Sequence, residues 1–181
     1  MTGFLGSGKT TLLNHILTST EHKMKFAVIE NEFGDVGIDE NIIVESSEES
    51  IIEVMNGCIC CTVRGDLTDL LKSMYERISD FDGVLIETTG LADPAPVAQT
   101  FFVDDDIVDK YKLDGIITVA DAKHITQHLD EEKPEGVENE SVEQIAFADR
   151  IMLNKIDLVS EEELEEVESK IKSINRFAPL Y

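Results

Sequence analysis

The feature that most constrains this chain is a glycine-rich stretch close to its N-terminus. Residues 3–10 read GFLGSGKT, which matches the pattern G-x-x-x-x-G-K-[ST], and residues 11–17 place apolar side chains at helical spacing. Glycines let the backbone curl closely around an anion, and the N-terminus of the following helix adds N–H donors and a favourable dipole. The stretch therefore predicts a phosphate-binding loop that leads into a helix.

The groups of this loop have separate expected roles. Lys9 should reach the β and γ phosphates of a nucleotide, and the Thr10 hydroxyl should hold Mg²⁺. The loop residues expected to bind the nucleotide are Gly3, Gly6, Ser7, Gly8, Lys9, Thr10 and Thr11. A β-strand should precede such a loop, but only Met1 and Thr2 stand before it. We therefore expect a sheet that lacks its first strand.

Short apolar runs alternate with helical patterns along the rest of the chain. The runs are rich in β-branched side chains and mostly continuous, as strands buried on both faces should be. They lie at residues 26–29, 51–54, 84–86, 116–120 and 151–153. Apolar spacing predicts one helix over 67–78 and another after a capping box formed by Ser160 and Glu163. An acidic stretch at 130–143 is expected to be an exposed loop. The alternation predicts an α/β fold, a P-loop NTPase three-layer sandwich with a mainly parallel sheet.

Length and charge limit the possible functions. With 181 residues, 42% of them hydrophobic, the chain can bury one core, so we expect one domain over 1–181. The 15 basic and 38 acidic residues give a net charge of −23, which would repel nucleic acid. We see neither a membrane-spanning run nor a signal peptide. We expect a cytoplasmic protein without nucleic-acid or membrane partners, and an organelle-targeting segment upstream stays open.

Two later segments turn the phosphate loop into a nucleotide site. The strand at 84–86 runs into Glu87, an acid that can meet Mg²⁺ or its water, and Gly90 can offer its N–H to the γ-phosphate. The strand at 151–153 runs into the pattern N-K-x-D, formed by Asn154, Lys155 and Asp157. The Asp157 carboxylate can accept two hydrogen bonds from N1–H and the 2-amino group of guanine. These features favour GTP over ATP.

The three cysteines of the chain all lie within four positions, at Cys58, Cys60 and Cys61. An odd number of such close neighbours makes a disulfide framework a poor explanation. Thiolates are soft ligands that suit Zn²⁺ and related ions. Cys58 and Cys61 also have the C-x-x-C spacing of redox pairs, and a purely structural role is a further alternative. We favour a metal site.

Six ordered segments together resemble the GTPase domain of the CobW family: GFLGSGKTTLLNHIL, VIENEFGDVGID, NGCICC, LIETTGLADPAPV, DGIITVADAKH and LNKIDL. Members of this family are P-loop GTPases related to UreG and HypB, with a glutamate at the Walker B position and a C-x-C-C metal motif. The resemblance implies slow GTP hydrolysis that is coupled to delivery of a metal, most often zinc, to a client metalloprotein. One branch is tied to cobalt and cobalamin, so cobalt stays an alternative. Members usually continue into a smaller C-terminal domain, which we expect to be absent here.

The resemblance also assigns roles to residues. Glu87 and Gly90 would be the Walker B acid and the γ-phosphate sensor, and Glu32 would hold Mg²⁺ or position the attacking water. The catalytic side chains would be Lys9, Glu32 and Glu87, and the candidate metal ligands are Thr10, Glu30, Glu32, Asp35, Cys58, Cys60, Cys61 and His124. His124 and His128 lie four apart on an expected helix, and His124 falls in a segment that resembles the family. Rival readings are a nucleotide-regulated binding protein without useful hydrolysis and a phosphotransferase, and a homodimer stays open.

Overall fold

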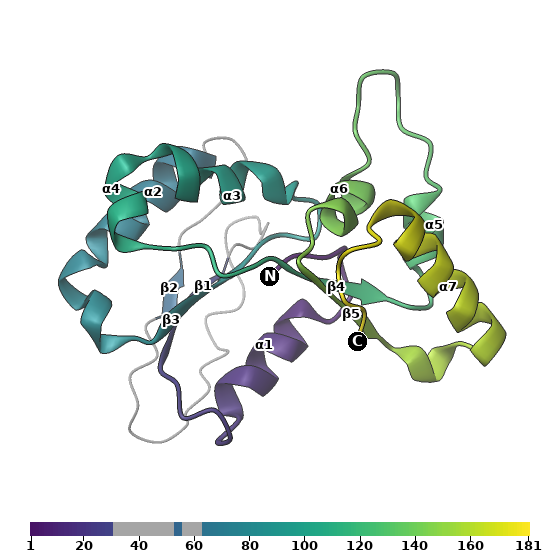
Figure 1. The fold of residues 1–181 in the computed structure, drawn as a ribbon, viewed down its shortest axis with the longest axis horizontal. Coiled ribbons are helices and arrows are strands. Elements are labelled where there is room, and N and C mark those ends of the chain that lie inside the picture. Colours follow the sequence, from purple (N-terminus) through teal and green to yellow (C-terminus); the bar gives the residue numbers. More distant parts are fainter. Residues whose placement is uncertain (31–52, 56–62) are drawn as a thin grey trace.

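The computed structural model describes residues 1–30, 53–55 and 63–181 of the chain. Helices and strands alternate along the sequence (Figure 1). In chain order they are α1 (Lys9–Thr18), β1 (Phe26–Glu30), β2 (Glu53–Met55), α2 (Val63–Ser73), η1 (Tyr75–Asp80), β3 (Gly83–Glu87), α3 (Pro94–Val103), α4 (Asp105–Lys110), β4 (Ile117–Asp121), α5 (Ile125–Leu129), α6 (Glu140–Ala146), β5 (Arg150–Asn154), η2 (Ile156–Leu158) and α7 (Glu161–Ile174).

The strands pair in parallel in two groups, β2-β1-β3 and β4-β5. Val28 of β1 pairs with Leu85 of β3, and Val119 of β4 pairs with Met152 of β5. Strands lie at all five predicted positions, with ends within about two residues of those expected. Residues 51 and 52 of the second predicted strand lie outside the described residues. The prediction of an α/β fold with a mainly parallel sheet is confirmed.

Met1 and Thr2 join the two groups of strands. Thr2 donates its N–H to the carbonyl of Ile117 and accepts from the N–H of Val119, both at 2.8 Å. On the other side the N–H of Thr88 donates to the carbonyl of Met1 at 3.0 Å, and the two threonine hydroxyls are 3.0 Å apart. Met1 and Thr2 therefore lie between β3 and β4. This is the position of the strand that should precede the phosphate loop, of which the chain has these two residues.

The described residues form two hydrophobic clusters, one for each group of strands. The first cluster packs α2, α3 and α4 against β1 and β3, and the second packs α5, α6 and α7 against β4 and β5. Figure 1 shows α2, α3 and α4 on one side of the β1–β3 strands and α1 on the other, which is the layering expected of a sandwich. The fully buried side chains include Ala27, Ile29, Leu71 and Ile107 in the first cluster, and Ile145, Ile151 and Ile171 in the second.

The predicted single helix over 67–78 is wrong at its end. Helix α2 stops at Ser73, and a separate 3₁₀ helix, η1, begins at Tyr75. The N–H of Met74 is shared between the carbonyls of Leu70 and Leu71, at 3.3 and 3.2 Å, and the Ser73 hydroxyl donates to the Leu70 carbonyl at 2.7 Å. These bonds tighten the last turn, so the apolar spacing continues while the α-helix does not.

The predicted loop over 130–143 is also wrong at its end. Its first ten residues connect α5 to α6, but Glu140 already begins α6. The Asn139 side chain caps this helix by accepting the N–H groups of Ser141 and Val142, at 2.9 and 3.3 Å. A good N-cap residue therefore starts a helix inside an acidic stretch that composition alone assigns to solvent.

The predicted capping box of the last helix is confirmed. The Ser160 hydroxyl accepts the N–H of Glu163 at 3.2 Å, and the Glu163 carboxylate accepts the N–H of Ser160 at 2.8 Å. One turn further on, α7 buries Val167 and Ile171 in the second cluster. Within the described ranges no helix is both long and apolar enough to cross a membrane.

Replacing Ser160 by alanine should lower the free energy of unfolding by about 1 kcal/mol, because the first turn of α7 loses its cap. Urea denaturation of the purified domain measures this change. Ser173→Ala is the matched control, since the exposed Ser173 hydroxyl bonds only the Lys170 carbonyl in the last turn of the same helix. A loss for Ser160→Ala no larger than that of the control would contradict the prediction.

Candidate nucleotide site

Polar side chains gather where the parallel strands end. Strand β4 ends at Asp121 and β5 at Asn154, and these two residues are partners in the pairing register. Glu87 ends β3 and is paired with Glu30, which ends β1. Ligands of open α/β sheets bind at this carboxyl edge. The register therefore brings the predicted acid of the site and the predicted N-K-x-D motif to one edge of the fold.

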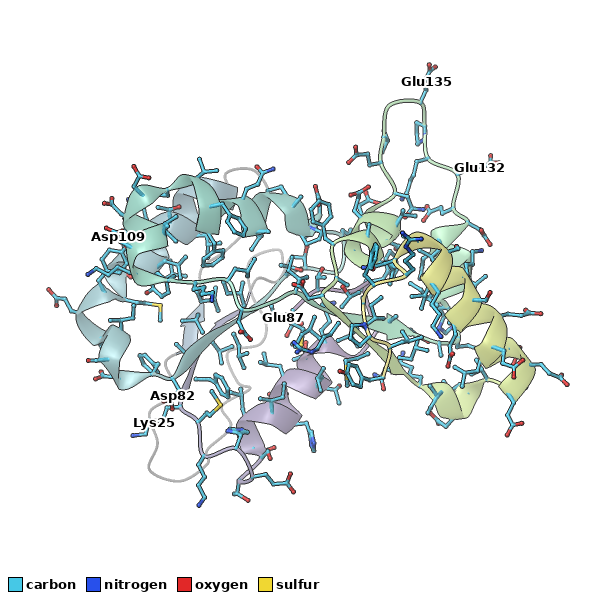
Figure 2. All side chains as sticks on the ribbon, viewed as in Figure 1. Lys25, Asp82, Glu87, Asp109, Glu132 and Glu135 are labelled. Carbon is cyan, nitrogen blue, oxygen red and sulfur yellow. The ribbon has the colours of Figure 1, made fainter. Side chains whose placement is uncertain are left out.

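Glu87 differs in its surroundings from most acids of this anionic chain. Its side chain is only 8% exposed. Figure 2 shows it in the middle of the molecule, whereas Asp109, Glu132 and Glu135 project from the outside. Burying a carboxylate is costly unless it has partners. Glu87 is therefore set apart by its burial, while the labelled outer acids contribute to the surface charge.

The phosphate-binding loop has the backbone that its sequence predicts. Gly6 and Gly8 have φ angles of 75° and 102°, in the region that favours glycine, and α1 begins at Lys9 directly after Gly8. A Cβ atom on Gly8 would lie 2.2 Å from Nδ2 of Asn154, so a larger residue would displace this amide. Gly3 joins Met1 and Thr2 to this loop, while Thr10 and Thr11 lie in the first turn of α1.

Two side chains of the N-K-x-D motif hold this loop from outside. Nδ2 of Asn154 donates to the Ser7 carbonyl at 2.9 Å, and Nζ of Lys155 donates to the Gly6 carbonyl at 2.7 Å. Lys155 has a φ of 60°, which turns the chain into η2, where Asp157 is exposed. The structure thus brings the predicted phosphate loop and the predicted guanine motif together and leaves the Asp157 carboxylate at the surface.

The predicted ligands of Mg²⁺ also meet. Oγ1 of Thr10 donates to Oε1 of Glu87 at 2.9 Å. A hydroxyl and a carboxylate are oxygen ligands that suit Mg²⁺. Lys9 is 6% exposed, and its Nζ lies 3.4 Å from the Phe4 carbonyl inside the loop. The Ser7 hydroxyl is buried and makes no hydrogen bond to the described residues. These groups fit a phosphate with its metal ion.

Gly90 packs directly against the phosphate loop. A Cβ atom on Gly90 would lie 2.4 Å from the backbone nitrogen of Leu5. The segment after Glu87 therefore touches the loop through a residue that has no side chain. The predicted γ-phosphate sensor lies next to the loop that should hold the phosphates.

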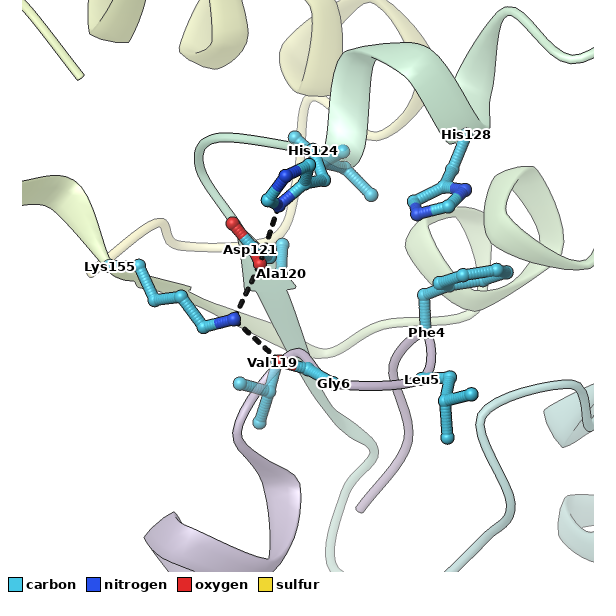
Figure 3. A pocket seen from close by; sticks show the side chains of 10 residues that line it. Phe4, Leu5, Gly6, Val119, Ala120, Asp121, His124, His128 and Lys155 are labelled. Atoms are coloured by element: carbon cyan, nitrogen blue, oxygen red, sulfur yellow. Dashed lines mark hydrogen bonds and ion pairs between the residues drawn. The ribbon is translucent and has the colours of Figure 1, made fainter. Parts of the chain in front are cut away.

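A cavity of about 220 Å³ lies beside the loop, and Asp121 is its charged centre (Figure 3). Oδ2 of Asp121 accepts from Nζ of Lys155 at 2.7 Å and from Nδ1 of His124 at 3.0 Å. Burial acts to raise the pKa of Asp121, but hydrogen bonds from Lys155, His124 and the N–H of Lys123 outweigh it and lower the pKa below its ordinary value of 3.8. The ionised carboxylate therefore fixes both partners.

Both predicted histidines line this cavity. His124 precedes α5 as its N-cap and is not in the helix as expected, and its side chain is 53% exposed. With Nδ1 bonded to Asp121, Nε2 is the ring nitrogen that remains to bind a metal. His128 stacks on Phe4 with ring centroids 3.5 Å apart, and burial lowers its pKa below 6.5.

The structure describes only some of the predicted metal ligands. Among the described residues no group of three or more His, Cys, Asp or Glu side chains is placed to hold a metal ion. Other predicted residues lie outside the described residues: Glu32, Asp35, Cys58, Cys60 and Cys61, together with the side chain of Glu30.

Two residues near the site, Asp121 and Gln144, were not singled out by the sequence reasoning. Asp121 ends a buried strand in a segment that resembles the family, so its place at the carboxyl edge was an available signal. Gln144 gave no such signal. It lies in α6 between an acid and an apolar residue, and it is 1% exposed. No spacing or motif marks a buried amide of this kind.

Comparison with known proteins decides the family. The sequence profile of the CobW/HypB/UreG nucleotide-binding domain matches residues 1–181. The chain belongs to this family. It is 42% identical to the zinc chaperone YjiA of Escherichia coli and 42% identical to zinc-regulated GTPase metalloprotein activator 1 of Schizosaccharomyces pombe. These matches cover 100% and 99% of the chain but 55% and 44% of those proteins, so the chain spans about half the length of the curated relatives it matches.

Solved structures agree with this assignment. The crystal structure of Zn(II)-bound YjiA GTPase from E. coli superposes with a TM-score of 0.69 at 36% identity, and covers 99% of this chain and 55% of that one. A Zn(II)-bound triple mutant of the same GTPase gives a TM-score of 0.73 over the same shares. This CobW/HypB/UreG domain therefore has the P-loop GTPase fold that its motifs predict.

The Asp121 carboxylate should stabilise the domain in a pH-dependent way. Because its pKa is lower in the folded state, its contribution is present above the unfolded pKa of about 3.9 and is lost as the pH falls through the folded value. The difference in unfolding free energy between the wild type and Asp121→Asn should shrink below about pH 4. Urea denaturation across this range tests it, with the exposed Asp109→Asn as control. A difference that did not shrink below about pH 4 would contradict this account.

Proposed function

We propose that this domain binds GTP with Mg²⁺, hydrolyses it to GDP and phosphate, and couples the nucleotide state to the binding and delivery of zinc to a client metalloprotein. The observation that supports the nucleotide part of the proposal is the pair of hydrogen bonds between the N-K-x-D motif and the phosphate loop. Asn154 and Lys155 bond the carbonyls of Ser7 and Gly6, while Asp157 stays exposed for a base. Phosphate and guanine recognition would therefore act on one ligand.

The described residues would bind and orient GTP. Lys9 and the N-terminus of α1 would offset the charge of the phosphates, and Thr10 and Glu87 would hold Mg²⁺, which when bound neutralises charge on the β and γ phosphates. The Gly90 N–H would contact the γ-phosphate, and Glu32 is our candidate for positioning the attacking water. Catalysis would then be positioning and charge neutralisation, with a slow rate in the absence of a supplied arginine.

The zinc part of the proposal is supported by the names of the relatives and by the thiols. YjiA is named a zinc chaperone, and the yeast relatives are named zinc-regulated GTPase metalloprotein activators. Cys58, Cys60 and Cys61 supply thiolates that suit Zn²⁺, and Glu30 and His124 are candidates for the remaining positions. Asp35 is a further candidate, and cobalt is the alternative metal.

The sheet offers a route between the two sites. Glu30 pairs with Glu87 in the register, so a candidate zinc ligand and the Walker B acid end neighbouring strands. If one nucleotide state favours one arrangement of this edge, GTP changes zinc affinity by the same factor by which zinc changes GTP affinity.

Zinc affinity measured by competition with a chromophoric chelator, with GDP and with a non-hydrolysable GTP analogue, tests the coupling. We expect at least about a fivefold difference between the two nucleotide states. Cys60→Ser should weaken zinc binding in both nucleotide states. Glu87→Gln should slow GTP hydrolysis, and it changes none of the candidate cysteine ligands. Equal zinc affinity with both nucleotides would refute the coupling, and transfer of phosphate to an acceptor other than water would refute the hydrolase.

Guanine selection can be tested through Asp157. Replacing it by asparagine removes the acceptor for the guanine 2-amino group and supplies an N–H that can donate to the 2-carbonyl of xanthine. GTP affinity should fall by roughly 10- to 100-fold, and xanthosine triphosphate should become the better ligand. Competition against a fluorescent nucleotide measures both. Asp149→Asn, which changes an aspartate that bonds the Ile116 N–H far from the motif, should leave the preference for GTP intact.

A further inference from the structure

Gln144 is a buried side chain of α6 whose amide bonds the segment beside the proposed nucleotide site. Its Nε2 donates to the carbonyls of Gly90 and Ala92, each at 3.1 Å. Because both neighbours are carbonyl oxygens, the nitrogen of the amide and not its oxygen must face them. One side chain from α6 thus holds two peptide groups of the segment that follows Glu87.

A third hydrogen bond closes the same turn. The N–H of Ala92 donates to the carbonyl of Thr89 at 3.1 Å, which makes a four-residue turn over 89–92. In a trans peptide the C=O and N–H point in opposite directions, so the N–H of Gly90 points away from the inside of this turn. Thr89 fixes the peptide before Gly90, and Gln144 fixes the peptide after it.

The orientation of this turn is restricted, because Gly90 lies against the phosphate loop. The distance of 2.4 Å between a Cβ built on Gly90 and the nitrogen of Leu5 shows that the two backbones are in contact. A rotation of the turn would either press Gly90 into the loop or break the contact between the two backbones. The Gln144 side chain opposes this rotation and therefore fixes the direction of the Gly90 N–H.

Gln144 is itself held on the opposite side. Its backbone carbonyl accepts from the Thr118 hydroxyl of β4 at 2.6 Å, and Thr118 is 1% exposed. The Asn175 amide, at the end of α7, donates to the carbonyls of Ile145 and Ala148, both at 2.9 Å. Helix α6 is thus anchored to the sheet and to α7, so it can act as a fixed support for the turn.

From these contacts we infer that Gln144 is a positioning residue that sets the Gly90 N–H for the γ-phosphate and thereby raises the affinity for GTP over GDP. Gln144 acts through Gly90. This inference rests on the proposed nucleotide site. Because GDP has no γ-phosphate, only the triphosphate gains from a correctly placed Gly90 N–H. Loss of the amide donor should therefore separate the two nucleotides, whereas a general loss of packing would affect both.

The test uses Gln144→Met and Gln144→Leu, which keep an uncharged side chain in the buried site and lose the N–H donors. In both variants the affinity for a fluorescent non-hydrolysable GTP analogue should fall about tenfold, while the affinity for fluorescent GDP changes less than about twofold. The thermal unfolding midpoint of the GDP-bound form should fall by only a few degrees, because two carbonyls lose their donor while the variants still fold. Gln127→Met, an exposed glutamine of α5, is the matched control and should change neither affinity.

Three results would overturn the inference: equal losses for the two nucleotides, no loss for either, or variants that unfold with GDP bound. Each would show that the amide serves general stability or nothing measurable. A wild-type chain that binds neither nucleotide would instead refute the proposed function, and that measurement precedes the variants.

Discussion

The geometry of this site depends on the bond from the Asn154 amide to the Ser7 carbonyl, at 2.9 Å. A peptide C=O and the N–H of the next residue point in opposite directions, so a carbonyl held outward turns the Gly8 N–H inward. That N–H is one of the donors that a phosphate loop offers to an anion. The motif that should select the base therefore also shapes the loop that should hold the phosphates. This double use explains why a side chain on Gly8 would displace the Asn154 amide.

The parallel sheet makes that bond possible. Asn154 and Asp121 are register partners at the ends of β5 and β4, so the Asp121 carboxylate lies where it can bond Nζ of Lys155. Lys155 then reaches the Gly6 carbonyl from a backbone with a positive φ. A buried carboxylate is costly, and here three donors offset the cost and keep it ionised. One charge thus fixes a lysine on one side and a histidine on the other.

The sequence predicts most of what repeats locally and little of what meets across the fold. The glycine spacing, the Ser160 capping box and the N-K-x-D pattern each depend on neighbours in the chain, and each is confirmed or brought to its expected place. The break in helix at Met74 depends on an N–H shared between two carbonyls, which apolar spacing does not reveal. The early start of α6 depends on one asparagine cap, which the acidic composition of the stretch does not reveal. Gln144 bonds carbonyls 52 and 54 positions away, and no local pattern encodes such a contact.

These contacts also constrain how a γ-phosphate could act on the rest of the molecule. Gly90 has a fixed neighbour on each side, because the phosphate loop is held by Asn154 and α6 is held by β4 and α7. Because both neighbours are held, a displacement of Gly90 would be transmitted along its own segment, toward Glu87 at the end of β3. Glu87 is paired with Glu30 at the end of β1, the strand that leads to the remaining candidate zinc ligands. Under the proposed function, a change at Gly90 would therefore reach the strand end at Glu30.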